Sequence, residues 1–265
     1  MPERSSEQHQ LVGDKARLGS RGWCKWRFRS SWSTRYSDPP SAVQGEGPST
    51  GRLCAFLRLG GCNLTCRWCD TPYTWDWKGE SDTGIAYRAA DELHALSVDE
   101  VTERLLGFGV ELIVISGGEP LSQQDRVLPV VRALGRQGVA VEFETNGTVM
   151  PTDTLVETGV RFNVSPKLAH SGVAEDRRIV PEVLRRFGEL PTAAFKFVCA
   201  DRSDLAEVDA LVGELNLKNV WIMPRGQSPE EIEHGMRTLA DDVIARKWNL
   251  SGRLHVNVWG SKRGI

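Results

Sequence analysis

The segment ELIVISGGEP (residues 111–120) joins a short apolar run to a glycine-rich turn, and this combination decides the fold. The continuous apolar run within residues 111–116 predicts a buried strand. The turn SGGEP (116–120) contains two adjacent glycines, which let the backbone approach a ligand closely. In α/β proteins, loops that follow parallel strands form the edge where active sites lie.

Strands and helices alternate on both sides of this segment. The alternation indicates parallel βαβ units, and the apolar strands are expected to be covered by helices on at least one face. The helix at 96–109 should start with a capping box of Ser97 and Glu100, and Pro129 should kink or reset the helix at 122–138. The predicted strands are 53–59, 111–116, 139–145, 161–165, 193–199, 219–224 and 253–259, and the predicted helices are 96–109, 122–138, 152–158, 181–187, 203–215 and 228–248.

Five short polar loops follow these strands and favour a barrel over a doubly wound sheet. In such folds the loops after the carboxyl ends of the strands share one face. We therefore expect an α/β chain with a partial or modified (β/α) barrel. The five loops are SGGEP (116–120), ETNGT (144–148), SPK (165–167), MPRG (223–226) and WGSKRG (259–264).

The composition is that of a globular protein without strong charge bias. The 265 residues carry a formal net charge of −2 and are 40% hydrophobic. The chain has no apolar run near the ~20 residues that span a bilayer, and its N-terminus lacks the apolar region of a secretory signal. We therefore expect no membrane partner, no general attraction to nucleic acid, and a reducing, cytoplasmic location.

Residues 1–40 differ from the rest of the chain. They contain eight Lys or Arg and four Asp or Glu, so their local net charge is +4. With little hydrophobic periodicity, they are predicted to be a disordered extension before a catalytic domain at 41–265, and residues 1 to about 34 are predicted to contribute little to folding. Pro39 and Pro40 disfavour a central strand at the junction.

Three of the six cysteines lie close together in GGCNLTCRWCDTPYT (60–74). Cys62, Cys66 and Cys69 have the spacing C-x₃-C-x₂-C and follow the predicted strand 53–59, so they belong to the same functional edge. Three thiolates suit either zinc or an iron–sulfur cluster.

The number of thiols distinguishes the two metals. A structural zinc site needs a fourth ligand, but no Cys or His lies nearby at a usual zinc spacing, since Cys54 lies in a strand and Cys199 far downstream. A [4Fe–4S] cluster on three cysteines would leave one iron open to another ligand. A closed zinc knuckle that uses a distant fourth ligand remains the alternative.

The cysteine spacing, with Trp68 before the last cysteine and SGGEP one βα unit later, resembles the radical S-adenosylmethionine superfamily. The resemblance implies a partial barrel of that type. It also implies that the open iron chelates the amino and carboxylate groups of S-adenosylmethionine. An electron from the cluster then cleaves the sulfonium and yields a 5′-deoxyadenosyl radical.

A closer resemblance extends from about Val43 to the C-terminus. The chain is similar to the 7-carboxy-7-deazaguanine synthase family, which converts 6-carboxy-5,6,7,8-tetrahydropterin into 7-carboxy-7-deazaguanine with loss of ammonia, for 7-deazapurines such as queuosine. The family implies Mg²⁺, a homodimer, and an electron donor such as flavodoxin or ferredoxin. The matching segments are QGEGPSTG (44–51), FLRLGGCNLTCRWCDTPYTWDW (56–77), SGGEPL (116–121), ETNGT (144–148) and SPK (165–167).

The resemblance also implies the site residues, with no catalytic group beyond the cluster and substrate sites. Cys62, Cys66 and Cys69 would hold the cluster, and Thr71 would bind Mg²⁺ together with substrate carboxylate oxygens. The residues implied for S-adenosylmethionine are Trp68, Cys69, Asp70, Gly117, Gly118, Glu119, Asn146, Ser165, Pro166 and Lys167. Those implied for the substrate are Val43, Gln44, Gly45, Glu46, Arg58, Ser116 and His255, the last on the predicted strand 253–259.

Each assignment has a simpler alternative. Thr71 and Asn146 could be turn residues, Arg58 a surface charge, and Trp68 and His255 core residues. For the whole chain, a glycyl-radical enzyme activase shares the cysteine spacing but must admit a loop of a partner protein. A non-catalytic iron–sulfur or zinc protein is the alternative of a different class.

Overall fold

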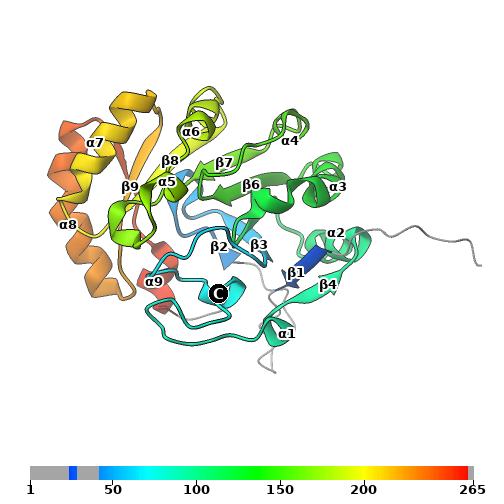
Figure 1. Cartoon of the computed structure of the whole chain (residues 1–265). Helices are drawn as coiled ribbons and strands as arrows, with labels where there is room; N and C mark the ends of the chain where they lie inside the picture. The colour runs from blue at the N-terminus through cyan, green and yellow to red at the C-terminus, as the bar shows by residue number, and fades with distance from the viewer. Residues whose placement is uncertain (1–23, 29–41, 262–265) are drawn as a thin grey trace, which may run out of the picture.

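A curved sheet of seven parallel strands forms the centre of the protein (Figure 1). The computed structural model describes residues 24–28 and 42–261. The sheet has the order β10-β9-β8-β7-β6-β5-β3-β1-β4, and β2 pairs with β3. The parallel strands are β3 (Leu53–Leu59), β5 (Leu112–Gly117), β6 (Ala140–Thr145), β7 (Arg161–Val164), β8 (Ala193–Cys199), β9 (Val220–Pro224) and β10 (Asn249–Leu250). The antiparallel strands are β1 (Cys24–Phe28), β2 (Ala42–Val43) and β4 (His94–Leu96).

Helices follow the outer side of the curve, where Figure 1 shows α2, α3, α4, α6, α7 and α8 around the sheet. The end strands β10 and β4 do not pair within the described part of the chain, so the barrel is partial, as predicted. The helices are α1 (Ala89–Glu92), α2 (Val98–Gly107), α3 (Gln124–Arg136), α4 (Asp153–Val156), α5 (Glu175–Arg178), α6 (Pro181–Gly188), α7 (Asp204–Leu215), α8 (Pro229–Ala245) and α9 (Leu254–Trp259).

The two faces of the sheet differ in chemistry. In β8, Phe195 and Phe197 belong to the apolar core beneath the helices, whereas the alternate residue Lys196 lines a cavity on the inner side. The same alternation places Leu57 of β3 outward and Arg58 inward. Because side chains alternate with a period of two along a strand, one sequence supplies both a core and a polar inner wall.

Most predicted elements are confirmed within a few residues. β3 and β8 have the predicted bounds, and α2 begins with the predicted capping box. In that box the Glu100 amide donates to Ser97 Oγ at 3.2 Å, and the Ser97 amide donates to Glu100 Oε2 at 2.7 Å. The helix α3 runs through Pro129 without interruption.

The predicted strand 253–259 is wrong, because this segment forms the helix α9. The last sheet strand is instead the two-residue β10, after which Ser251 donates its amide to Ile222 O at 2.9 Å. The Leu254 amide then donates to Gly45 O at 2.9 Å, which draws the chain away from β9. A tertiary contact thus overrides the β-propensity of this Val- and Trp-containing run.

The predicted disorder of residues 1–40 does not hold for residues 24–28, which form β1 between β3 and β4. Edge strands present unpaired N–H and C=O groups to any extended segment, so this pairing needs no hydrophobic periodicity. The other residues of that extension lie outside the described part of the chain.

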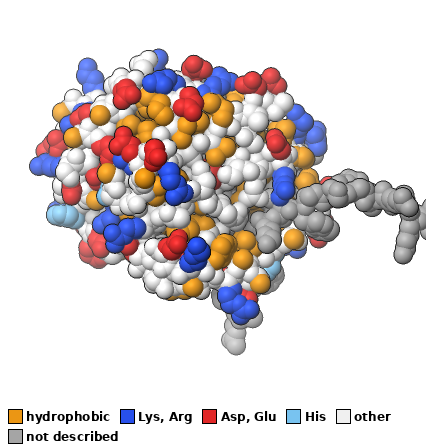
Figure 2. Space-filling view, in the orientation of Figure 1, with side chains coloured by type: hydrophobic (Ala, Val, Ile, Leu, Met, Phe, Trp, Pro, Cys, Tyr) orange, Lys and Arg blue, Asp and Glu red, His pale blue; other side chains and the backbone are white. Residues whose placement is uncertain are grey.

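The charged surface residues form no single pattern on the face shown in Figure 2, where acidic and basic side chains are interspersed. Among the described helices, none combines the length and the apolar character that crossing a bilayer requires. The charges that concern function lie inside the partial barrel.

Phe162 tests the apolar layer between sheet and helices. It is 1% exposed and packs against Phe143 and Phe187, with ring centroids 5.9 and 5.3 Å away. Phe162→Ala should lower the free energy of unfolding by about 3–5 kcal/mol, because it leaves a cavity in a close-packed core. Urea unfolding followed by circular dichroism measures this loss.

The matched control is Ile244→Ala, since Ile244 is 72% exposed on α8. Its free energy of unfolding should stay within about 0.5 kcal/mol of the wild type. Equal losses in the two variants would show that Phe162 is not part of the core.

Candidate active site

A cavity of about 600 Å³ lies at the carboxyl ends of the parallel strands. Its wall unites residues from the Gln-Gly-Glu-Gly segment, the cysteine loop and the loops after the strands. Glu119 and Pro166 are predicted site residues that do not line it. The predicted residues that do line it are Val43, Gln44, Gly45, Glu46, Arg58, Cys62, Cys66, Trp68, Cys69, Asp70, Thr71, Ser116, Gly117, Gly118, Asn146, Ser165, Lys167 and His255.

The cysteine loop lies directly against the turn after β5. The Gly118 amide donates to Leu59 O and the Glu119 amide to Gly61 O, both at 2.9 Å. A Cβ atom on Gly118 would lie only 1.7 Å from Gly61 O, and Gly117 has a φ of +125°. These two glycines therefore let two backbones touch, which fixes the cysteine loop over the sheet.

Among the three clustered thiols, Cys66 is buried and Cys62 and Cys69 are partly buried. Burial raises the pKa of Cys62 to about 12 and that of Cys66 to about 11, and it also raises the pKa of Cys69. Metal binding must therefore displace the protons of these thiols.

The arrangement fits a cluster better than a single zinc ion. Among the described residues, no three His, Cys, Asp or Glu side chains converge closely enough to hold one metal ion. The three thiols line one cavity of about 600 Å³, which has room for a group larger than an ion. The buried Cys54 and Cys199 do not line the cavity, so neither supplies a fourth thiol there.

An aromatic side chain, Trp68, and a cationic one, Lys167, lie close together in the cavity wall. Trp68 stacks on His170 with ring centroids 5.2 Å apart, and its indole Nε1 is buried without a hydrogen-bond partner. Lys167 Nζ donates to Ser165 Oγ at 2.9 Å and lies 5.8 Å from the Trp68 ring centroid. An unpaired indole donor beside a cation provides a place for an aromatic ligand with acceptor atoms.

Glu119 supports this wall from behind. It is fully buried, and its carboxylate accepts hydrogen bonds from the Leu121 amide, the Asn146 amide and the Thr145 hydroxyl at 2.7–3.0 Å. Burial raises its pKa. The structure thus gives Glu119 the role of holding the turn at Asn146, whose side chain reaches the cavity and donates to Asn63 Oδ1 at 2.9 Å.

Thr71 lies beside the last cysteine. Its Oγ1 donates to Gly117 O at 3.3 Å and lies 3.6 Å from Cys69 Sγ. Thr71 is part of the cavity wall, and the residue is only 9% exposed. It can therefore offer its hydroxyl oxygen to a cation that is bound inside the cavity.

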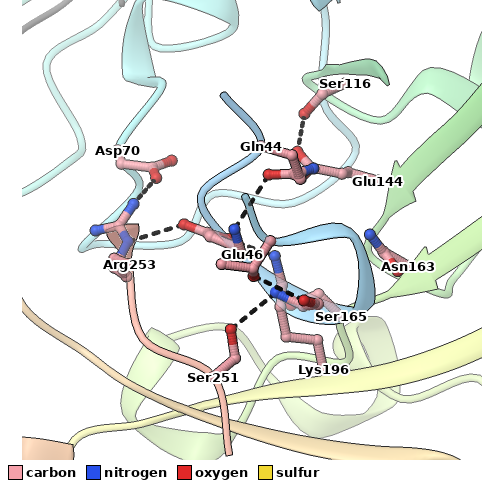
Figure 3. Close-up of polar contacts among 12 residues, drawn as sticks. Gln44, Glu46, Asp70, Ser116, Glu144, Asn163, Ser165, Lys196, Ser251 and Arg253 are labelled. Carbon is pink, nitrogen blue, oxygen red and sulfur yellow. Dashed lines mark hydrogen bonds and ion pairs between the residues drawn. The ribbon is translucent and has the colours of Figure 1, made fainter. Parts of the chain in front are cut away.

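The Gln-Gly-Glu-Gly segment is tied to the inner face of the sheet (Figure 3). Gln44 donates its amide to Glu142 at 3.3 Å and Glu144 at 3.2 Å, and its Oε1 accepts the Glu46 amide at 3.2 Å. Since Gln44 is 1% exposed, its side chain orients Glu46. The neighbouring glycine must remain small, because a Cβ on Gly45 would lie 2.0 Å from His255 Nδ1.

Glu46 is a carboxylate held in its ionised form by two cations. Burial alone would raise its pKa, but Lys196 and Arg253 hold the pKa well below the usual value. Lys196 Nζ pairs with Glu46 Oε2, and Arg253 Nε donates to Glu46 Oε1 at 2.8 Å. The pKa of His255 is lowered by burial, so its ring adds no charge at neutral pH.

Arg58 points into the same space from β3. Its Nη1 donates to Ser116 Oγ at 3.3 Å, and Ser116 donates to Glu144 Oε2 at 2.6 Å. The Nε atom of Arg58 is buried and has no partner. This guanidinium retains donor capacity for an anionic group in the cavity.

Sequence reasoning missed Glu144, Lys196 and Arg253. A signal was present for the first two. Lys196 is the one charged residue of the apolar strand AAFKFVC (193–199), and Glu144 alternates with Val141 and Phe143 together with Glu142 in AVEFET (140–145). Such a residue must face a polar interior. No signal marked Arg253, which was assigned to a strand that does not exist.

Comparisons with known proteins agree with this geometry. The model of the Radical SAM superfamily matches residues 57–190. The 7-carboxy-7-deazaguanine synthase of Pyrobaculum aerophilum is 35% identical over 84% of this chain and 94% of that protein. The synthase of the same name from Hyperthermus butylicus is 33% identical over 82% and 89%. The crystal structure of QueE from Escherichia coli has the same fold, with a TM-score of 0.62 and 24% identity over 88% of this chain and 94% of that one.

The bound iron should depend on the three thiols that line the cavity. Changing Cys62, Cys66 or Cys69 to Ala should each abolish most of the iron bound after anaerobic reconstitution, because no other thiol among the side chains that the structure describes lines the cavity. Cys54→Ala and Cys199→Ala are the controls and should keep their iron. Iron and sulfide analysis measures the effect, and loss of iron in either control would contradict the assignment.

Asp76 organises the loop that follows the cysteines. Its carboxylate accepts four backbone amides, those of Lys78 at 3.3 Å, Gly79 at 2.7 Å, Glu80 at 2.8 Å and Ser81 at 2.8 Å. Burial alone would raise its pKa, but the Ser81 side chain and the backbone amides of Ser81, Glu80 and Gly79 lower it to about 2. The carboxylate therefore stabilises the fold above the unfolded pKa, and this contribution is lost as pH falls from about 4 to about 2.

Asp76→Ala should lower the free energy of unfolding at pH 7 by about 2 kcal/mol, and its difference from the wild type should shrink below pH 4. Unfolding of the reduced, cluster-free chain at several pH values measures both effects. Asp241→Ala, on the exposed side of α8, should show neither. A deficit for Asp76→Ala that does not change with pH would refute this role.

Proposed function

Because the chain belongs to the 7-carboxy-7-deazaguanine synthase family of the radical SAM superfamily, we propose that it converts 6-carboxy-5,6,7,8-tetrahydropterin into 7-carboxy-7-deazaguanine with release of ammonia. The observation that supports this most is a single cavity that joins three cysteine thiols to the Gln-Gly-Glu-Gly segment and Arg58. A cavity lined by charged and polar side chains suits a small polar substrate.

Cys62, Cys66 and Cys69 would hold a [4Fe–4S] cluster. When bound, the cluster and S-adenosylmethionine supply the radical chemistry of the reaction. The chain's own residues bind S-adenosylmethionine and the substrate and orient them. The proposed contacts of S-adenosylmethionine are the cavity-lining residues Trp68, Cys69, Asp70, Gly117, Gly118, Asn146, Ser165 and Lys167.

The substrate side of the proposal rests on charge. The ionised Glu46 can accept N–H donors of the pterin, and Arg58 can pair with the substrate carboxylate through its free donor capacity. Lys196 keeps Glu46 ionised and in place through their ion pair. Thr71 would join the substrate carboxylate in binding Mg²⁺, which neutralises charge and orients the substrate.

The wider setting is also a proposal, and the family resemblance supports it. The enzyme would act as a homodimer in the cytoplasm and would receive electrons from a flavodoxin or ferredoxin. Its product would serve 7-deazapurine synthesis, including that of queuosine for tRNA.

The direct test is turnover by the anaerobically reconstituted enzyme with reductant, S-adenosylmethionine, Mg²⁺ and the carboxypterin. We expect 7-carboxy-7-deazaguanine and ammonia in equal amounts. Cleavage of S-adenosylmethionine without either product would exclude this substrate. Activation of a glycyl-radical protein instead would favour the activase alternative.

Mg²⁺ should stimulate turnover through Thr71. Adding Mg²⁺ to metal-stripped, cluster-loaded enzyme should raise the rate, and Thr71→Ala should lose most of the response while keeping its iron. Thr71→Ser retains the hydroxyl and should keep more of the response. A Thr71→Ala enzyme that responds as the wild type does would place the magnesium site elsewhere.

A further inference from the structure

Arg253 joins three parts of the cavity wall that are distant in sequence (Figure 3). Its Nε donates to Glu46 Oε1 at 2.8 Å, its Nη2 to Asp70 Oδ2 at 2.5 Å, and its Nη1 to Gly226 O at 2.8 Å. Arg253 is 9% exposed, and its contacts with Glu46 and Gly226 are shielded from solvent, whereas Asp70 lies at the exposed end of the network. Each nitrogen of the guanidinium thus holds a different segment.

The segment that carries Arg253 is itself docked on the Gln-Gly-Glu-Gly loop. The Gly47 amide donates to Ser251 Oγ at 2.8 Å, and the Leu254 amide donates to Gly45 O at 2.9 Å. The ring of His255 occupies the space that a Cβ on Gly45 would need. The position of the guanidinium is therefore set by the backbone on both sides of it.

The two carboxylates that Arg253 holds belong to opposite halves of the cavity. Glu46 lies in the half assigned to the substrate, and its other oxygen pairs with Lys196. Asp70 follows Cys69 directly, and Arg253 is its only ion-pair partner among the described residues. About half of the Asp70 side chain is exposed, so little besides Arg253 restrains it.

Without the guanidinium, two like charges would face each other. Arg253 contacts both carboxylates at once, Glu46 through Nε and Asp70 through Nη2. Lys196 would still hold Glu46, but Asp70 would lose its anchor and would be pushed away from Glu46. Because Asp70 follows Cys69, this displacement would also move the loop that carries the cysteines.

We propose that Arg253 is a positioning residue that couples the cofactor half of the cavity to the substrate half by holding Asp70 and Glu46 in one fixed geometry. The coupling rests on the proposed function, since it assigns a substrate to the Glu46 side. Arg253 acts through these two carboxylates. Losing it should therefore weaken binding on both sides and let S-adenosylmethionine be cleaved without productive attack on the substrate.

The test uses cluster-loaded enzyme with Arg253→Gln and Arg253→Lys. Four quantities are measured: iron content, the Kd of S-adenosylmethionine, kcat and KM for the carboxypterin, and the ratio of 5′-deoxyadenosine to product. The matched control is Arg246→Gln. Arg246 also donates several hydrogen bonds to carboxylates, those of Asp209 and Asp242, but it caps the C-terminal end of α8, outside the cavity.

Arg253→Gln should keep its iron, raise KM at least about 10-fold, weaken S-adenosylmethionine binding, and raise the ratio of 5′-deoxyadenosine to product. Arg253→Lys should fall between it and the wild type, because one ammonium cannot replace a planar fork that reaches two carboxylates. Arg246→Gln should match the wild type in all four quantities.

Asp70→Asn distinguishes the effect of Arg253 on the cofactor half of the cavity from its effect on the substrate half. It should weaken S-adenosylmethionine binding with a smaller effect on KM, and adding Arg253→Gln should weaken that binding little further, because both changes break the same contact. Additive losses would contradict coupling through Asp70. If Arg253→Gln does not fold, Arg253→Lys and Asp70→Asn decide the question by the same measurements.

The outcomes also separate this inference from the proposed function. If the wild type converts the carboxypterin but Arg253→Gln matches Arg246→Gln in KM, Kd and product ratio, the coupling role is wrong and the function stands. If the wild type does not convert it, the function is wrong. The Kd of S-adenosylmethionine then decides the role of Arg253, with an unchanged value refuting it.

Discussion

The structure depends on the strict alternation of side chains along its parallel strands. Outward residues such as Phe162 and Phe195 are apolar and pack beneath the helices, whereas several inward residues, such as Glu144 and Lys196, are polar and line the cavity. A sheet that is hydrophobic on one face must cover that face, and here the helices do so. The curve of the sheet then brings the polar positions of separate strands together around one cavity.

Polar groups inside a protein need partners, and this requirement shapes the cavity. Glu46 has a cation on each carboxylate oxygen, and Glu142 accepts hydrogen bonds from Gln44, Ser49 and Asn163. An unpaired carboxylate at such a buried position would destabilise the fold more than an unpaired carboxylate on the surface does. The wall is therefore held in place before any ligand arrives, which lowers the entropic cost of binding.

Motif residues serve packing as much as chemistry. Gly117 and Gly118 allow the turn after β5 to touch the cysteine loop, and Glu119 fastens the turn at Asn146 instead of lining the cavity. Gln44 likewise donates its side-chain amide to Glu142 and Glu144. A motif identified by sequence thus includes residues that position the site as well as residues that can touch a ligand.

The sequence by itself determined the parallel α/β architecture, the cysteine loop and most of the cavity wall. Those features arise from local signals: hydrophobic periodicity, the capping box at Ser97, and short motifs after strands. Only the tertiary structure decided that residues 254–259 form a helix and that Arg253 bridges Glu46 and Asp70. The physical reason is that these outcomes depend on hydrogen bonds and ion pairs between segments far apart in the chain, which leave no local pattern in the sequence.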